Sequence, residues 1–203
     1  MSLLDQYAEA SGWAVGKAAV AASDLDAKTP CDGWDVRTLM NHVLQTQQYF
    51  VASARGQEAA PPNGEPPELL SDDPASDFVH ARAEMLRAFG EHGVVEKTGP
   101  LLGIAFADQL LHGWDLARAT NQDTTMPAGL AEAAYGAIHG KFTDEQRVGT
   151  FGPEVSVAED ASPQDKLLAY TGRDPGGSAW ARPPWDCSTA SGNHARPPLP
   201  TTR

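Results

Sequence analysis

Residues 108–120 read DQLLHGWDLARAT, a run that combines apolar residues at helical spacing with two carboxylates and a histidine. The apolar side of such a helix carries Leu110, Leu111, Trp114 and Ala117. Asp108, His112 and Asp115 fall within about 60° of one another on an adjacent side. The run therefore predicts an amphipathic helix that presents ionisable side chains beside an apolar core.

A second run of helical spacing lies far upstream and contains His42. It starts after Asp35, a residue suited to cap a helix, and continues to about Arg55. Its apolar stripe consists of Val36, Leu39, Met40, Val43, Leu44, Phe50 and Val51. His42 falls on the flank of this stripe, so we expect it to face a neighbouring helix rather than the centre of the core. Thr38 and Tyr49 fall in line with it, where they would contact a substrate or pack in the core.

These two helices predict a metal site. Asp108 and His112 lie one helical turn apart on a single face. His42 from a neighbouring helix would complete a set of two histidines and one carboxylate, which holds a divalent metal with coordination positions left open. Two plainer interpretations stay open: a packed histidine on a helix flank, and a simple hydrogen bond between Asp108 and His112. Burial of three ionisable groups is unfavourable unless they are neutralised or ligated, which favours the metal.

Helical spacing in the rest of the sequence indicates an all-α fold. The four main helices are expected at residues 3–22, 35–55, 73–90 and 102–120. Between the last two, residues 93–103 are expected to form a short connection with a brief extended stretch at Val94 and Val95. A further helix is expected near residues 127–138, and a short one capped at Thr143 with Gln146 in the capping-box position.

The end of the sequence divides into a last helix and a tail. The helix is expected to open at Ser162 and Pro163 and to end near Gly172. From residue 173 onward proline and glycine dominate, so we expect a bundle of residues 1–172 and a proline-rich tail of residues 173–203. Trp180 and Trp185 would dock on the body or on a second subunit, and a loose extension is the plainer alternative.

Composition restricts the class of protein. The sequence carries 27 acidic against 15 basic residues, a net charge of −12 that disfavours nucleic acid as a partner. No apolar run approaches the roughly 20 residues that cross a membrane, and the first residues lack the pattern of a secretory signal. Cys31 and Cys187 lie far apart, which fits a reducing cytoplasm better than a structural disulfide. We therefore expect a soluble cytoplasmic protein.

Two motifs carry a resemblance to a known family. Residues 29–43, TPCDGWDVRTLMNHV, together with residues 108–120, resemble the actinobacterial metal-binding group of the DinB-like superfamily. This group is related to the N-terminal domain of mycothiol-dependent maleylpyruvate isomerase. The resemblance covers about residues 1–175, including LLAYTGRDP at residues 167–175. It implies an up-and-down four-helix bundle with a divalent metal near one end.

The resemblance also implies ligands and chemistry. The family's metal ligands correspond to His42, Asp108 and His112. Asp108 stands where the isomerase has a glutamate. Because the aspartate side chain is shorter, the metal is expected closer to that helix. The second domain of the isomerase is not expected in this chain. Zinc is the first choice of metal, with nickel or iron as alternatives. A mycothiol-type thiol would bind as a thiolate, which implies a thiol transferase or isomerase acting on a small electrophile.

Other functions and residues stay open. A metal-dependent hydrolase or lyase on a small molecule is one alternative function, and a non-enzymatic metal- or ligand-binding module is another. A homodimer is the possible assembly. Asp115 would either hydrogen-bond the second ring nitrogen of His112 or be an exposed charge paired with Arg118. Cys31 is expected to be structural, with a fourth ligand or a reactive thiol as alternatives. The remaining histidines, expected at the surface, are His80, His92, His139 and His194.

Overall fold

A computed structural model describes residues 1–176 except residues 32, 144–146 and 148–149. Its named elements are α1 (Leu3–Ala21), α2 (Val36–Ala54), α3 (Pro74–Gly90), α4 (Val94–Ala119), α5 (Leu130–Ile138) and α7 (Pro163–Tyr170). No strand occurs among these described residues, apart from a single isolated bridge between Lys28 and Asp35. The all-α prediction is confirmed.

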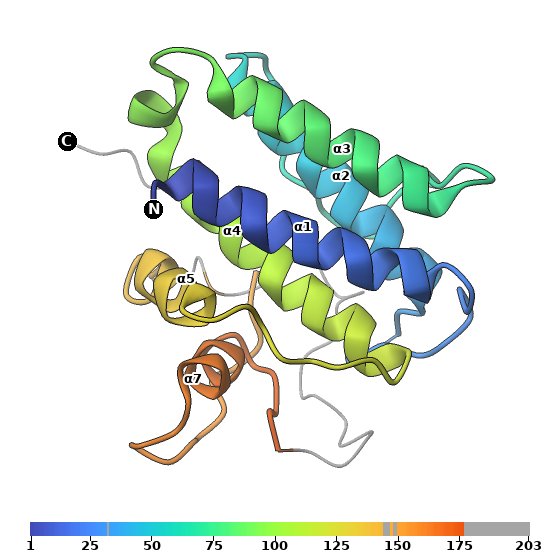
Figure 1. The fold of residues 1–203 in the computed structure, drawn as a ribbon, viewed down its shortest axis with the longest axis vertical. Coiled ribbons are helices and arrows are strands. Elements are labelled where there is room, and N and C mark those ends of the chain that lie inside the picture. Colours follow the sequence, from blue (N-terminus) through green and yellow to red (C-terminus); the bar gives the residue numbers. More distant parts are fainter. Residues whose placement is uncertain (32, 144–146, 148–149, 177–203) are drawn as a thin grey trace.

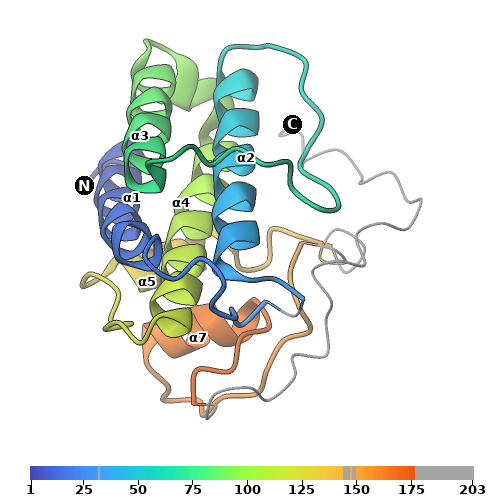
Figure 2. The same ribbon diagram turned by 90° about the vertical axis from the view of Figure 1, so that its right-hand side faces the viewer.

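The first four helices form the bundle (Figure 1). Helix α1 packs against α3 and α4, and α2 packs against the same two helices, so the order around the bundle is α1, α3, α2, α4. Helix α5 packs on α4, and α7 packs on α5. The second view shows α7 beneath the end of the bundle where α2 begins and α4 ends (Figure 2).

Most helix starts follow from their capping residues. The Asp35 side chain accepts a hydrogen bond from the Thr38 backbone N–H, and that of Asp73 accepts one from Ser76, which fixes the starts of α2 and α3. Ser162 caps α7 in the same way. These three starts agree with the sequence-based predictions.

The predicted connection at residues 93–103 is wrong. Helix α4 already begins at Val94, after Gly93 with a φ of 80°, and it runs through Pro100. A proline inside a helix removes one backbone hydrogen bond, but the neighbouring Leu101 and Leu102 are buried in the core and Val95 packs against it. Burial of these apolar side chains outweighs the loss, so the helix continues where a break was expected.

The C-terminal elements differ from the predictions only in detail. Helix α5 begins at Leu130 rather than near residue 127, because Gly129 adopts a φ of 79° and precedes the first turn. The short helix expected to be capped at Thr143 has its Gln146 outside the described residues. The tail from residue 177 onward, with Trp180 and Trp185, also lies outside them.

Two apolar clusters fill the bundle. The larger one joins all six named helices around the buried rings of Tyr7, Phe89 and Phe106, with Phe50 as its buried member from α2. The smaller one lies where α2 begins and α4 ends, with Leu39, Met40, Val43, Phe78, Leu116 and Cys31 among its buried members. His42 lies between these buried α2 residues in the sequence, and His112 lies one turn before Leu116 on α4. The smaller cluster therefore supports the helix segments that carry the two histidines.

Candidate metal centre

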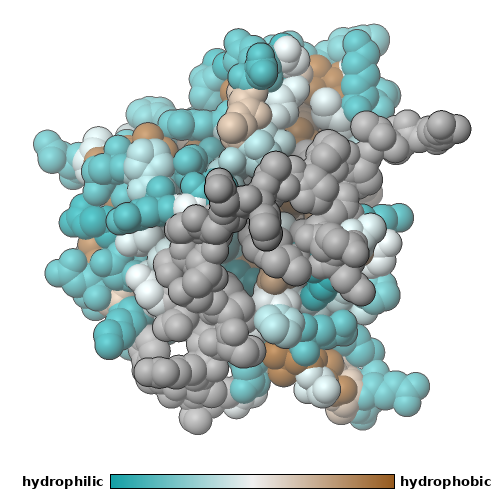
Figure 3. All heavy atoms as spheres, turned by 180° about the vertical axis from the view of Figure 1, so that it is seen from behind, coloured by the Kyte–Doolittle hydropathy of each residue, from teal (hydrophilic) through white to brown (hydrophobic). Residues whose placement is uncertain are grey.

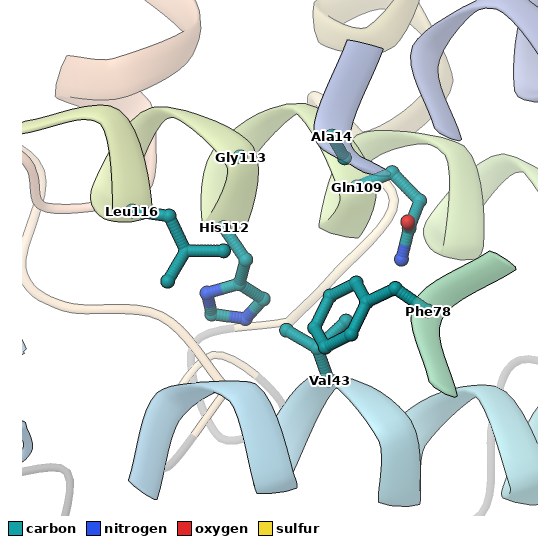
Figure 4. A pocket seen from close by; sticks show the side chains of 7 residues that line it. All are labelled: Ala14, Val43, Phe78, Gln109, His112, Gly113 and Leu116. Carbon is teal, nitrogen blue, oxygen red and sulfur yellow. The ribbon is translucent and has the colours of Figure 1, made fainter. Parts of the chain in front are cut away.

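His42, Asp108 and His112 come together at the contact between α2 and α4. Each of them offers one ligand atom, and these atoms all lie within 4.8 Å of one another. All three side chains are half-buried. The close view shows His112 projecting from α4 toward α2 (Figure 4). The three residues that the sequence predicted as a set are therefore neighbours in space.

The distances and the polar atoms fit a divalent cation. The Nε2 atom of His112 lies 3.4 Å from Oδ1 of Asp108, close to the roughly 3.3 Å that separates two ligands of a tetrahedral zinc ion. The ring centroids of His42 and His112 lie 5.2 Å apart at an angle of 82°. The other carboxylate oxygen of Asp108, Oδ2, is buried and has no hydrogen-bond partner among the residues that the structure describes. An acceptor oxygen left in this position fits a site that takes a cation.

Asp115 contacts the ring nitrogen of His112 that does not face Asp108. Its side chain is fully buried, and its Oδ2 lies 3.0 Å from Nδ1 of His112. This confirms the predicted hydrogen bond to the second ring nitrogen, and the alternative of an exposed charge paired with Arg118 is wrong. A proton on Nδ1 leaves the lone pair of Nε2 directed toward Asp108 and free for a metal.

The two carboxylates also set the protonation of the ring. Burial alone would lower the pKa of the His112 imidazole, but Asp108 and then Asp115 outweigh burial and raise this pKa to about 10. Burial alone would raise the pKa of the Asp115 carboxyl, but the Arg173 guanidinium and His112 hold it at about 2. Without a cation, the raised pKa means that the imidazole also carries a proton on Nε2, the nitrogen that a metal would bind in the neutral ring.

Apolar side chains close the inner side of the site. Val43 of α2, Phe78 of α3 and Leu116 of α4 surround the inner edge of His112 (Figure 4). The space that they leave is too small to admit a water molecule. On the α2 side, the ring of Trp34 lies 4.9 Å from that of His42. A dry wall of this kind strengthens electrostatic interactions at the site.

The other residues singled out from the sequence lie apart from this set. Cys31 is buried with its Sγ 3.9 Å from Oδ2 of Asp115, which agrees with the structural role expected of it. Thr38 donates a hydrogen bond to Asp35 at the start of α2, and Tyr49 packs half-buried beside Phe50. The histidines His80, His92 and His139 are exposed as expected, and His194 lies outside the described residues.

Sequence reasoning missed Arg173. This residue follows α7, is buried, and pairs with Asp115, 58 residues earlier in the chain. The prediction had placed it in the tail. The one available signal was its position in the motif TGRDP, directly after a glycine that ends a helix.

On the face opposite to that of Figure 1, the described residues are largely hydrophilic, with smaller hydrophobic patches between them (Figure 3). The large apolar side chains exposed on described residues are Met1, Val20, Val79 and Val157. Among the described helices, none combines the length and the apolar character that a membrane crossing requires. A homodimer stays a prediction.

Comparison with known proteins gives one family and two relatives. The family model described as the mycothiol maleylpyruvate isomerase N-terminal domain matches residues 8–120, more than half of the chain. Two uncharacterized proteins of Mycobacterium tuberculosis, from strains CDC 1551 / Oshkosh and ATCC 25618 / H37Rv, are each 29% identical over 168 residues. The alignments cover 76% of this chain and 87% of each relative. No solved structure matches significantly.

Proposed function

The chain belongs to the mycothiol maleylpyruvate isomerase N-terminal domain family, and on that premise we propose a metal-dependent thiol transferase or isomerase. His42, Asp108 and His112 hold a divalent metal in this proposal, and a low-molecular-weight thiol of the mycothiol type completes the site. The substrate is a small electrophilic molecule. The family membership supports the choice of thiol.

One observation carries the metal site: no described residue donates a hydrogen bond to the buried Oδ2 of Asp108, whose carboxylate belongs to a set with the His42 and His112 imidazoles. Leaving a buried carboxylate oxygen unpaired is unfavourable by about 1–3 kcal/mol or more. A buried oxygen of this kind is therefore expected to have a binding partner. A bound cation provides that partner. Imidazole and carboxylate ligands suit zinc first and accept nickel or iron.

The charges around the site favour an anion as the remaining ligand. When bound, a divalent cation would lower the pKa of a coordinated thiol and keep it as the nucleophilic thiolate. Asp108 contributes one negative charge, whereas the charge of Asp115 is cancelled by Arg173, 2.6 Å away. A net charge of about +1 therefore remains on the occupied site, which favours a thiolate over a neutral thiol.

Metal content tests this proposal first. We expect about one equivalent of metal in the purified protein, and a loss of metal in His42→Ala and His112→Ala. His80→Ala is the matched control, because His80 is exposed on α3 and should leave the metal content unchanged. Equal metal in all four proteins would remove the basis of the proposal.

The role of the thiol needs a second experiment. Titration of mycothiol into the cobalt-substituted protein should produce an absorption band of cobalt bound to sulfur, and His112→Ala should not show it. Turnover of an ester or amide without that band would indicate a hydrolase instead. Retained metal without turnover of any electrophile would indicate a binding module.

A further inference from the structure

The Arg173 guanidinium donates two hydrogen bonds to the carboxylate of Asp115, the residue that contacts Nδ1 of His112. Its Nε donates to Oδ1 of Asp115 at 2.9 Å, and its Nη2 donates to Oδ2 at 2.6 Å. Its Nη1 donates to Oγ1 of Thr171 at 3.2 Å. Arg173 and Thr171 are buried, and Asp115 is fully buried, so this ion pair is removed from solvent.

The backbone conformation at Gly172 and Arg173 fixes the position from which the Arg173 side chain extends. Gly172 has a φ of 86°, and a Cβ at that position would lie 2.6 Å from Cα of Gly152. Only glycine fits such a close approach. The backbone N–H of Arg173 then donates to the carbonyl oxygen of Leu168 at 2.9 Å, which fastens the residue to the end of α7.

From this geometry we infer that Arg173 is a positioning residue for the metal ligand His112, acting through Asp115. The inference rests on the proposed metal centre. Oδ2 of Asp115 accepts from both His112 and Arg173, so the guanidinium fixes the oxygen that in turn fixes the imidazole. Carboxylates that orient a metal-bound histidine are themselves held by hydrogen bonds, and their loss typically weakens metal binding 10- to 100-fold.

The competing interpretation is that Arg173 only fastens the C-terminal segment to the bundle. Arg147 provides a control for that role. Its Nη2 donates to the carbonyl oxygen of Tyr170 at 2.7 Å, and its guanidinium lies 4.3 Å from the centre of the Tyr170 ring. Arg147 therefore fastens the end of α7 through the backbone and ring of Tyr170 rather than through the Asp115 carboxylate.

The experiment compares Arg173→Gln, Arg173→Lys and Arg147→Gln in the full chain. Zinc affinity is measured by competition with a chromophoric chelator, the ligand field by the absorption of bound cobalt, and stability by thermal unfolding of the metal-free protein. We expect Arg173→Gln to bind zinc 10- to 100-fold more weakly with an altered cobalt spectrum. Arg173→Lys keeps the charge but loses the two-point contact, so it should recover only part of the affinity. Arg147→Gln should melt earlier with unchanged affinity and spectrum.

A double substitution tests whether the effect passes through Asp115. In an Asp115→Asn background, the added change Arg173→Gln should have little further effect on zinc affinity. If Arg173→Gln alone does not fold, the comparison of Asp115→Asn with and without Arg173→Gln, together with Arg173→Lys, still tests whether Arg173 acts through Asp115. Unchanged zinc affinity in Arg173→Gln, an equal loss in Arg147→Gln, or a full effect in the Asp115→Asn background would each overturn the inference. Absence of metal from the wild-type protein would instead overturn the proposed function.

Discussion

At the scale of single residues, His112 has a carboxylate at each ring nitrogen: Asp108 at Nε2 and Asp115 at Nδ1. The raised pKa of His112 means that the metal-free ring keeps its proton at neutral pH. A metal and a proton cannot share the Nε2 lone pair. Metal binding must therefore displace that proton.

We predict that zinc binding at pH 7 releases at least one proton. The sign follows from the direction of the shift: a raised pKa keeps the proton on His112 up to higher pH, so acid competes with the metal. Below this raised pKa the apparent affinity should fall about tenfold per pH unit. Calorimetry in two buffers with different ionisation enthalpies counts the released protons.

Asp115→Asn is the control for this pH effect. It removes one of the two charges that raise the pKa of His112, so fewer protons should be released at pH 8 than from the wild-type protein. Zinc binding at pH 7 without proton release would contradict the assignment of His112 as a ligand through Nε2.

The sequence predicted that the three candidate ligands lie together, and the structure brings them together, but the residues that hold His112 in place were predicted less well. Asp108 and His112 share one helix, so their separation follows from helical geometry. Asp115 was predicted with two alternatives, because the side of a helix that becomes buried depends on its neighbours. Arg173 was not predicted, since an ion pair across 58 residues depends on the packing of α7 and leaves no periodic signal.

At the scale of helices, α1 and α4 approach each other closely at Gly113, directly after His112. A Cβ at this position would lie 2.5 Å from Cζ3 of Trp13 and 3.3 Å from the backbone of Ala14. The glycine therefore lets the Trp13 ring lie against α4. Without it, the helix that carries Asp108 and His112 would move away from α1.

We predict that Gly113→Ala destabilises the protein by about 1–3 kcal/mol, the usual effect of overpacking a tight contact. The measurement is a shift of the urea midpoint at constant slope. Gly16→Ala is the matched control, because nothing lies within 4 Å of a Cβ there. It should stabilise α1 by about 0.5–1 kcal/mol, because alanine has a higher helix propensity than glycine. Equal effects of the two substitutions would contradict the close approach.

Helix boundaries were predictable where a side chain caps the end. Asp35, Asp73 and Ser162 each accept a backbone hydrogen bond at the expected start. The start of α4 was not predictable in this way. Residues 93–103 were expected to form a connection. They include Pro100, which disfavours a helix interior, whereas burial of the apolar side chains around it stabilises the helix.

At the scale of the whole molecule, the C-terminal segment takes part in the site. Helix α7 packs on α5, and α5 packs on α4, so the chain returns to the helix that carries two of the candidate ligands. Arg173 extends this contact to Asp115. The order of the helices along the chain could be predicted from periodicity. The packing of the C-terminal segment back onto α4 could not, because it depends on which apolar faces of the helices meet.

The predicted division into residues 1–172 and 173–203 stays a prediction, but the structure suggests where a cut would matter. Residues 173–176 are described and include the buried Arg173. We predict that a chain ending at residue 172 is about 3–5 kcal/mol less stable than a chain ending at residue 176, because only the longer chain keeps Arg173 beside Asp115. This is the usual effect of leaving one member of a buried ion pair without its partner.

Urea unfolding of the two shortened chains measures this difference. The loss falls on a protein whose total stability is expected to be only about 5–15 kcal/mol, so the shorter chain should have a much lower midpoint. Arg173→Gln in the chain ending at 176 separates the arginine from the other three residues, and it should reproduce most of the loss. Equal midpoints for the chains ending at 172 and 176 would show that the bundle is complete without Arg173.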